Sequence, residues 1–153
     1  MNRSVLGWLL VALQALLLLG LILLPWRTPT VVSLIVGAIL VVAGLLAGIA
    51  ATLRLGSALT ATPVPLTSAT LRTTGIYQLI RHPIYSALLL VIAGLVIAAG
   101  SWWSCLWGLG IGCFFYGKSR WEDAMLRSVY DQQWLGWAAT TGAFIPRLRR
   151  RLR

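Results

Sequence analysis

Four long apolar stretches alternate with polar breaks along most of the chain, and they cover residues 5–24, 31–51, 84–99 and 102–116. Apolar stretches of this length without a polar face are typical of helices that cross a membrane. The last two are shorter than the roughly 20 residues that a bilayer requires, so we expect their helices to extend into flanking residues or to tilt less than the first two. The pattern predicts an all-α integral membrane bundle of about four transmembrane helices.

The breaks between the apolar stretches differ in length. Pro25 and Pro29 predict a turn between the first two stretches, and Gly100 predicts one between the last two. Residues 52–83 are rich in threonine, serine and proline and have no sustained apolar period, so we expect an extended cytosolic loop there. Long loops that are ordered are often functional.

Within the second stretch, glycines recur at Gly37, Gly44 and Gly48. Small residues at helix surfaces let two membrane helices approach closely. We therefore expect another helix to pack against this face.

After the fourth stretch the pattern becomes mixed. Trp121, Met125 and Val129 recur every fourth residue with charged residues between them, which predicts a cytosolic interfacial amphipathic helix within residues 118–146. Residues 147–153 form a basic tail of mostly arginine. We expect this tail to bind anionic lipid headgroups. The whole chain, residues 1–153, reads as a single membrane domain.

Composition supports a membrane location, since 59% of the residues are hydrophobic and only 10% are charged. The net charge of +10 could suggest nucleic acid, but the arginines flank apolar stretches and form no basic stripe with exposed aromatics, so we expect no nucleic acid partner. Under the positive-inside rule the distribution of the arginines predicts a multi-pass protein of the plasma or inner membrane with both termini cytosolic.

The first apolar stretch is longer than a signal-peptide core and no small-residue cleavage site follows it, so we expect this stretch to be retained.

Candidate chemistry is sparse. Cys105 and Cys113 have no histidine or cysteine partner at metal-binding spacing, so no metal site is expected. All three acidic residues, Glu122, Asp123 and Asp131, follow the fourth stretch. Ion-coupled exporters need an ionisable group within the membrane, and this arrangement disfavours that class of function.

The one histidine, His82, stands between Arg81 and Pro83 at the start of the third predicted helix. Proline there has a structural explanation, because the first turn of a helix needs no N–H donor, and the Arg-His pair could simply anchor the interface. However, His82 and the Glu122-Asp123 pair both lie at cytosolic helix ends, so they can meet in space. A cation, a histidine and carboxylates near the membrane surface suit group transfer from a soluble donor to a lipid-bound acceptor.

Two blocks of sequence resemble the isoprenylcysteine carboxyl methyltransferases and the related phospholipid N-methyltransferases. Residues 71–85, LRTTGIYQLIRHPIY, resemble the family's Gly-Pro-Tyr turn and Arg-His-Pro-x-Tyr signature at the start of a helix that contains a glycine, here Gly94. Residues 122–126, EDAML, resemble its Glu-Glu-x-x-Leu block, and an aromatic repeat and a closing Ile-Pro follow at Tyr130, Trp134, Trp137 and Phe144-Ile145-Pro146.

The chain departs from the family pattern at a few positions. Ile76 replaces the usual proline, Asp123 replaces the second glutamate, and Trp134 and Trp137 replace tyrosines. These departures concern the identity of the substrate more than the type of reaction.

The resemblance implies a membrane methyltransferase that uses S-adenosylmethionine and a lipidic acceptor that enters sideways from the bilayer. It implies catalytic roles for Arg81, His82 and Glu122. It implies that cofactor contacts come from Gly75, Tyr77, His82, Pro83, Tyr85, Glu122 and Asp123. An amine acceptor needs a base, which Glu122 or His82 could supply, whereas a carboxylate or thiolate acceptor needs none. The acceptor group stays open, and the alternative function is a non-enzymatic membrane subunit that kept the fold.

Overall fold

A computed structural model describes residues 2–60, 62, 64 and 70–147 of the chain. In this part the chain is helical and contains no strand, in agreement with the predicted all-α class. The elements, in order, are α1 (Arg3–Leu23), α2 (Val31–Leu55), the short 3₁₀-helices η1 (Gly56–Ala58) and η2 (Gly75–Gln78), α3 (Pro83–Ala99) and α4 (Trp102–Thr140).

The ends of the helices follow from local sequence. The side chain of Asn2 accepts a hydrogen bond from the Ser4 N–H at the start of α1, and Thr30 caps α2 in the same way through the Ser33 N–H. Pro83 is the first residue of α3, and Gly100 ends that helix with a φ of 58°, which glycine adopts without strain. The predicted turns at Pro25–Pro29 and at Gly100 are therefore confirmed.

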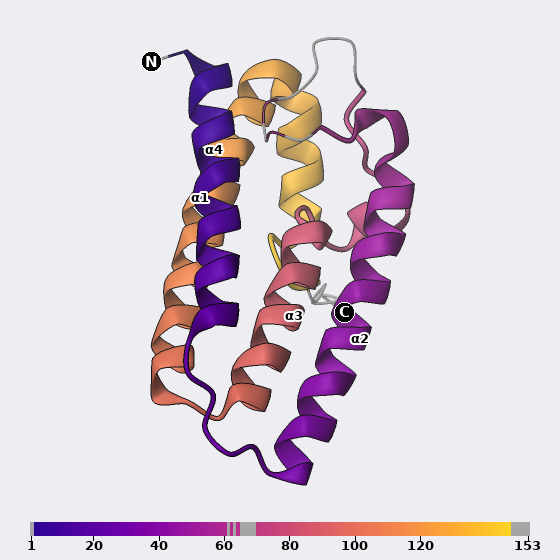
Figure 1. The fold of residues 1–153 in the computed structure, drawn as a ribbon. Coiled ribbons are helices and arrows are strands. Elements are labelled where there is room, and N and C mark those ends of the chain that lie inside the picture. The colour runs from indigo at the N-terminus through magenta and orange to yellow at the C-terminus, as the bar shows by residue number, and fades with distance from the viewer. Residues whose placement is uncertain (1, 61, 63, 65–69, 148–153) are drawn as a thin grey trace.

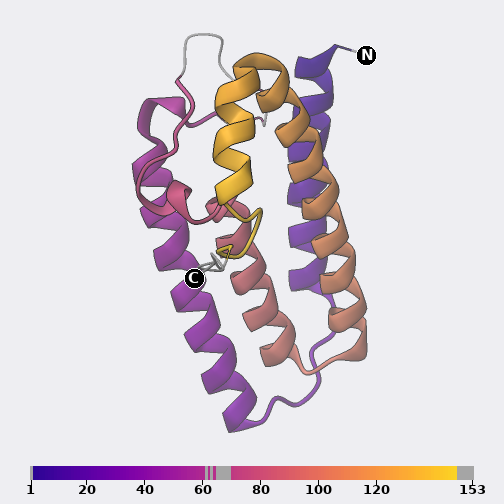
Figure 2. The same ribbon diagram turned by 180° about the vertical axis from the view of Figure 1, so that it is seen from behind.

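The four helices form a row in the order α1, α4, α3, α2, with α1 and α2 at its two ends (Figures 1 and 2). At the lower end in Figure 1, the Arg27 N–H donates to the Ala99 carbonyl over 3.0 Å and ties the two connecting turns together. The end of α2 and the kink of α4 lie at the opposite end (Figure 1).

Glycines let α2 and α3 pack with their backbones in close approach. A Cβ added to Gly37 would lie 2.7 Å from the Gly94 carbonyl oxygen, and one added to Gly94 would lie 2.6 Å from the Gly37 carbonyl oxygen. A Cβ on Gly44 would lie 2.7 Å from the Ala87 carbonyl oxygen, whereas one on Gly48 would lie at an ordinary 3.5 Å from the Ala87 Cβ. We call Gly37, Gly44 and Gly94 the glycine seam. The predicted close helix contact is confirmed at Gly37 and Gly44.

The predicted end of the fourth helix at residue 116 is wrong. The apolar stretch 102–116 continues as the helix α4 past residue 118, and a second helical segment of α4 follows a kink at Asp131 (φ 40°, ψ −112°). An interfacial position for the residues after 118 stays a prediction. Beyond this kink the last turns of α4 fold back toward the start of α3 (Figures 1 and 2). The physical reason is that Lys118 and Ser119 are buried between helices, so polar residues after Tyr116 face the interior of the bundle and do not mark a helix end.

Other predicted boundaries also shift. The third helix, α3, is only one residue longer than the predicted stretch 84–99, because it begins at Pro83. The loop predicted for residues 52–83 contains the end of α2 and both 3₁₀-helices. Of the basic tail 147–153, only Arg147 belongs to the described residues. The lipid-binding role of that tail stays a prediction.

Two of the described helices, α1 and α2, are long and apolar enough to cross a membrane by length and composition. Most of their surface is not buried inside the fold, and large side chains such as Leu16, Ile39 and Leu46 are exposed. The core helix of a water-soluble protein would bury such residues, whereas a lipid environment accommodates them. Four crossings with both termini cytosolic remain the predicted topology.

Candidate active site

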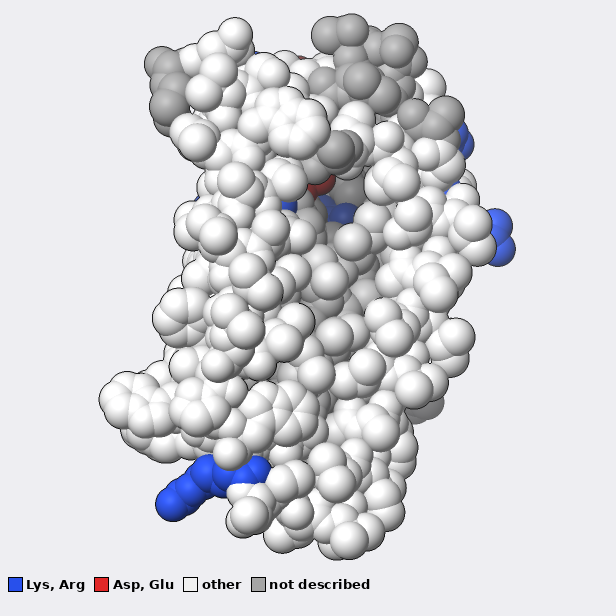
Figure 3. Space-filling model, in the orientation of Figure 1, with Lys and Arg blue, Asp and Glu red and all other residues white. Residues whose placement is uncertain are grey.

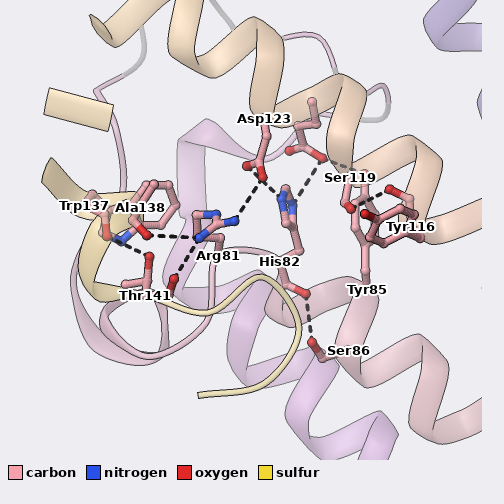
Figure 4. Close-up of polar contacts among 11 residues, drawn as sticks. Arg81, His82, Tyr85, Ser86, Tyr116, Ser119, Asp123, Trp137, Ala138 and Thr141 are labelled. Atoms are coloured by element: carbon pink, nitrogen blue, oxygen red, sulfur yellow. Dashed lines mark hydrogen bonds and ion pairs between the residues drawn. The ribbon is translucent and has the colours of Figure 1, made fainter. Parts of the chain in front are cut away.

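The start of α3 and the middle of α4 bring together an arginine, a histidine and two carboxylates, which we call the polar cluster: Arg81, His82, Glu122 and Asp123. Figure 4 shows Arg81, His82 and Asp123 pointing toward one another. The Nη2 of Arg81 donates to Oδ2 of Asp123 over 3.2 Å, and Nε2 of His82 lies 3.0 Å from Oδ1 of the same carboxylate. On the other side of the imidazole, Nδ1 of His82 lies 3.6 Å from Oε2 of Glu122. His82 therefore stands between the two acids, as the sequence predicts.

Backbone pairing holds the Arg81-His82 segment in place. The Arg81 N–H donates to the Gly142 carbonyl over 2.8 Å, and the His82 N–H donates to the Ala143 carbonyl over 3.0 Å. The Arg81 guanidinium also donates to the Thr141 carbonyl over 2.7 Å and lies over the Trp134 ring. The end of α4 is thereby fastened to the start of α3, and this explains why the chain folds back after Asp131.

Asp123 lies behind the imidazole and is buried. Burial alone would raise the pKa of Asp123, but the hydrogen bonds and charges of His82 and Arg81 outweigh it, so the pKa lies below its ordinary value. An ionised Asp123 satisfies both Arg81 and His82 at once. Its geometry is that of a residue that orients the other two.

Glu122 occupies a different environment one residue away. Its Oε2 accepts a hydrogen bond of 2.8 Å from the Tyr85 hydroxyl, and a quarter of its side chain stays exposed. Loss of water contact raises the pKa of Glu122, while the His82 and Lys118 charges and the Tyr85 hydrogen bond oppose the shift. Two adjacent acids are thus shifted in opposite directions, an arrangement that is common where carboxylates have separate roles.

Glu122 faces a cavity of about 260 Å³ enclosed by α1, α3, α4, η2 and the segment after α2. Figure 3 shows a hollow on the face between α1 and α2, with positively and negatively charged atoms at its base and uncharged residues around it. Of the residues predicted to bind a cofactor or act in catalysis, those that line the cavity are Tyr77, Arg81, His82, Pro83, Tyr85 and Glu122.

Two predicted cofactor contacts, Gly75 and Asp123, do not line this cavity. Gly75 opens η2 with a φ of 64°, and a Cβ there would meet the Arg54 side chain at 3.5 Å. Its positive φ is what calls for glycine at this turn. Asp123 contacts the lining residues Arg81 and His82 from outside the cavity.

Tyr77 is held where η2 faces the cavity. Its hydroxyl donates to the Ala51 carbonyl over 3.4 Å, and its own carbonyl accepts a hydrogen bond of 2.7 Å from Nε1 of Trp137. Burial, followed by the charge of Glu122, raises the pKa of Tyr77 to about 12. The phenol therefore stays protonated and serves as a wall and a donor.

The sequence analysis missed Lys118 and Gln14, which also line the cavity. Lys118 is buried, and its Nζ donates to Oε1 of Gln14 over 2.5 Å. Two signals in the sequence point to them. Gln14 is the one polar side chain of the first apolar stretch, and Lys118 precedes Glu122 by four residues and so shares its helix face.

Within the described residues, no group of three histidine, cysteine or acidic side chains is placed to hold a metal ion. Cys105 and Cys113 are both free and exposed.

The model of the phospholipid methyltransferase family matches residues 32–133 of the chain. This range begins in α2 and includes all four residues of the polar cluster. The resemblance drawn from residues 71–85 and 122–126 is thereby confirmed. A search of curated proteins finds no match.

Proposed function

Because the chain belongs to the phospholipid methyltransferase family, we propose that it transfers a methyl group from S-adenosylmethionine to a lipidic acceptor in the membrane. The proposal depends on one observation, that Glu122, His82, Arg81 and Tyr85 all line the same cavity. These residues come from two segments of the chain, and Tyr85 in one segment precedes Glu122 in the other by 37 residues. A protein that had kept only the fold would have no need for this convergence.

The donor set of the cavity fits S-adenosylmethionine. A sulfonium and an ammonium group require anionic or acceptor partners, which Glu122 provides, and a carboxylate requires cationic donors, of which Arg81 and Lys118 line the same cavity. Tyr77, Tyr85 and Trp137 add aromatic surface to the walls. When bound, S-adenosylmethionine supplies an electrophilic methyl group.

The protein's own contribution is positioning. Asp123 fixes Arg81 and His82 from behind, and Tyr85 fixes the Glu122 carboxylate by its hydroxyl. Holding an acceptor atom in line with the transferring group can lower the barrier by several kcal/mol. Side chains whose rotamers are locked by buried hydrogen bonds suit that task.

The requirement for a base depends on the acceptor. An amine acceptor must lose a proton, and Glu122 is suited to accept it because its pKa is raised. A carboxylate acceptor, as in isoprenylcysteine methylation, loses no proton, and Glu122 would then act by its charge alone. In both cases the lipid chain would approach through the hollow between α1 and α2, whose outer surfaces are apolar (Figure 3).

The test is calorimetric binding of S-adenosylmethionine to the protein in lipid nanodiscs. Wild type is expected to bind with micromolar affinity, and Glu122→Gln and His82→Ala are expected to weaken binding at least about tenfold by removing a charged or hydrogen-bonded partner. Asp131→Asn is the matched control, because it makes the same carboxylate-to-amide change at an exposed position outside the cavity. A folded wild type that does not bind the donor in lipid would overturn the proposal and favour a non-enzymatic role.

A further inference from the structure

Lys118 is a buried cation in the wall of the cavity, and only 6% of its surface is exposed. It lies on α4 one turn before Glu122. Its Nζ donates to the Gln14 side chain and lies 5.3 Å from the centre of the Tyr85 ring and 5.9 Å from that of Phe114. Its surroundings are thus a neutral amide and two aromatic faces.

Among the residues that the structure describes, no carboxylate lies within ion-pair distance of Lys118. Glu122 is the nearest acid along the helix, but its carboxylate accepts from Tyr85 and faces His82. An ammonium group has three donors, and Gln14 accepts only one of them. Burying a cation in this way is costly unless a counter-charge joins it.

The cavity as a whole is short of negative charge. Lys118, Arg81 and Arg72 line it, whereas Glu122 is the one acid among the described lining residues. Asp123 neutralises Arg81 from outside the cavity. Arg72 is exposed. Among the described lining residues, Lys118 is therefore the buried cation without an ion pair, and it lies beside open volume.

We propose that Lys118 and Gln14 form an anion subsite that binds the negatively charged oxygens of a ligand whose opposite, positively charged end lies at Glu122. The proposal rests on the proposed function and adds a specificity-determining pair to it. Four residues of helix separate Lys118 from Glu122 by about 6 Å, so the ligand group that spans them carries both charges a few ångströms apart.

Two ligands of the reaction can carry such a pair of charges. One is the amino-acid end of the donor, with its carboxylate and ammonium, and the other is the headgroup of an aminophospholipid acceptor, with its phosphate and amine. The shared chemistry is an anionic oxygen group beside an ammonium, and matched probes distinguish the two sources.

The experiment measures binding to the protein in lipid nanodiscs. The donor arm compares S-adenosylhomocysteine with its decarboxylated analogue. The acceptor arm compares a short-chain phosphatidylethanolamine with a diacylglycerol of the same chains. Lys118→Met removes the charge at similar length, Lys118→Arg keeps it, and Arg120→Met is the control at an exposed position on the same helix outside the cavity.

The expected result is that Lys118→Met weakens binding about tenfold or more for one probe that carries the anionic group and leaves the counterpart that lacks this group unchanged. Loss for S-adenosylhomocysteine alone assigns the subsite to the donor, and loss for the phospholipid alone assigns it to the acceptor. Lys118→Arg is expected to restore binding to within a few-fold, and Arg120→Met to change nothing.

Unchanged binding of both anionic probes by folded Lys118→Met would overturn the subsite while leaving the methyltransferase proposal standing. An equal loss for the probes with and without the anionic group would make Lys118 a structural residue and would overturn the subsite as well. Conversely, phospholipid binding that depends on Lys118, in a protein that binds no donor, would support the subsite and contradict the proposed function. Wild type that binds none of the probes would overturn both.

Discussion

The helix α3 is held to its two neighbours, α2 and α4, by opposite means. Along its length α3 meets α2 at the glycine seam, where backbones touch and an added methyl group would collide with a carbonyl oxygen. At its start α3 meets α4 through the polar cluster, where the buried His82 and Asp123 and the partly buried Arg81 are joined by hydrogen bonds. At the seam we expect an added methyl group to cost stability, whereas in the cluster we expect the loss of the Asp123 charge to do so.

This difference separates stability from function. The seam carries no group that could react, so changes there should affect folding alone. In the cluster, Asp123 faces inward to Arg81 and His82, while Glu122 faces the cavity. We therefore expect the boundary between a structural and a functional role to fall between two adjacent residues of α4.

The largest effect on stability is expected for Asp123→Ala. The change leaves Arg81 and His82 buried without their shared carboxylate, and removing one partner of a buried ion pair costs about 3 kcal/mol or more in the free energy of unfolding. Glu122→Gln is the comparison, since it removes a charge that burial disfavours and should leave stability nearly unchanged. Denaturant unfolding in mixed micelles measures both, and equal losses in the two variants would contradict the division of roles.

The seam gives the next largest effect. In Gly44→Ala the new Cβ would lie 2.7 Å from the Ala87 carbonyl oxygen, and the helices must separate at a cost of about 1–3 kcal/mol. Gly48→Ala is a matched control one helical turn later, because its Cβ would sit at 3.5 Å from the Ala87 Cβ and alanine favours the helix by up to about 1 kcal/mol. The same unfolding assay applies. Similar stability of the two variants would show that the seam is not tightly packed.

The pH dependence of stability sharpens the contrast between Glu122 and Asp123. Burial raises the pKa of Glu122 above 4.5 in the folded protein, so the folded state holds that proton more tightly, and the resulting stability is lost as the pH rises through the folded pKa. The pKa of Asp123 lies below 3.8, so its contribution is present above that value and is lost as the pH falls through the folded pKa.

The measurement is thermal unfolding across pH for wild type and for the two amide variants. The stability difference between wild type and Glu122→Gln should decline as the pH rises above about 4.5. The difference between wild type and Asp123→Asn should decline as the pH falls below about 3.8. Two curves with the same slope would show that the neighbouring acids are not in separate environments.

The sequence predicts some of these features better than others, for physical reasons. Apolar stretches and caps place α1, α2 and α3 closely, because lipid burial and helix ends are local properties. The continuation of α4 past Tyr116 was missed, because Lys118 and Ser119 are polar and their burial depends on neighbouring helices. The family signature identifies Arg81, His82 and Glu122, but the pairing of Gln14 with Lys118 joins residues 104 positions apart. Apolar periodicity cannot specify which helices are neighbours.

The smallest predicted effect concerns Tyr85, which connects the cluster to the cavity. Tyr85→Phe removes the hydroxyl that donates to Glu122 over 2.8 Å but keeps the ring that stacks on His82 and packs against Phe115. A hydrogen bond to a charged group contributes about 1.5–3 kcal/mol, but the Glu122 carboxylate can take up water from the cavity instead, so the loss of stability should stay below about 1 kcal/mol.

Methyl transfer by Tyr85→Phe is expected to fall several-fold because the Glu122 carboxylate loses its fixed orientation. Tyr116→Phe, which removes the hydroxyl of an exposed tyrosine on α4, is the control. If Tyr85→Phe matched that control in donor affinity and turnover, the position of Glu122 would be set by His82 and the helix alone, and Tyr85 would contribute only its ring to the cavity wall.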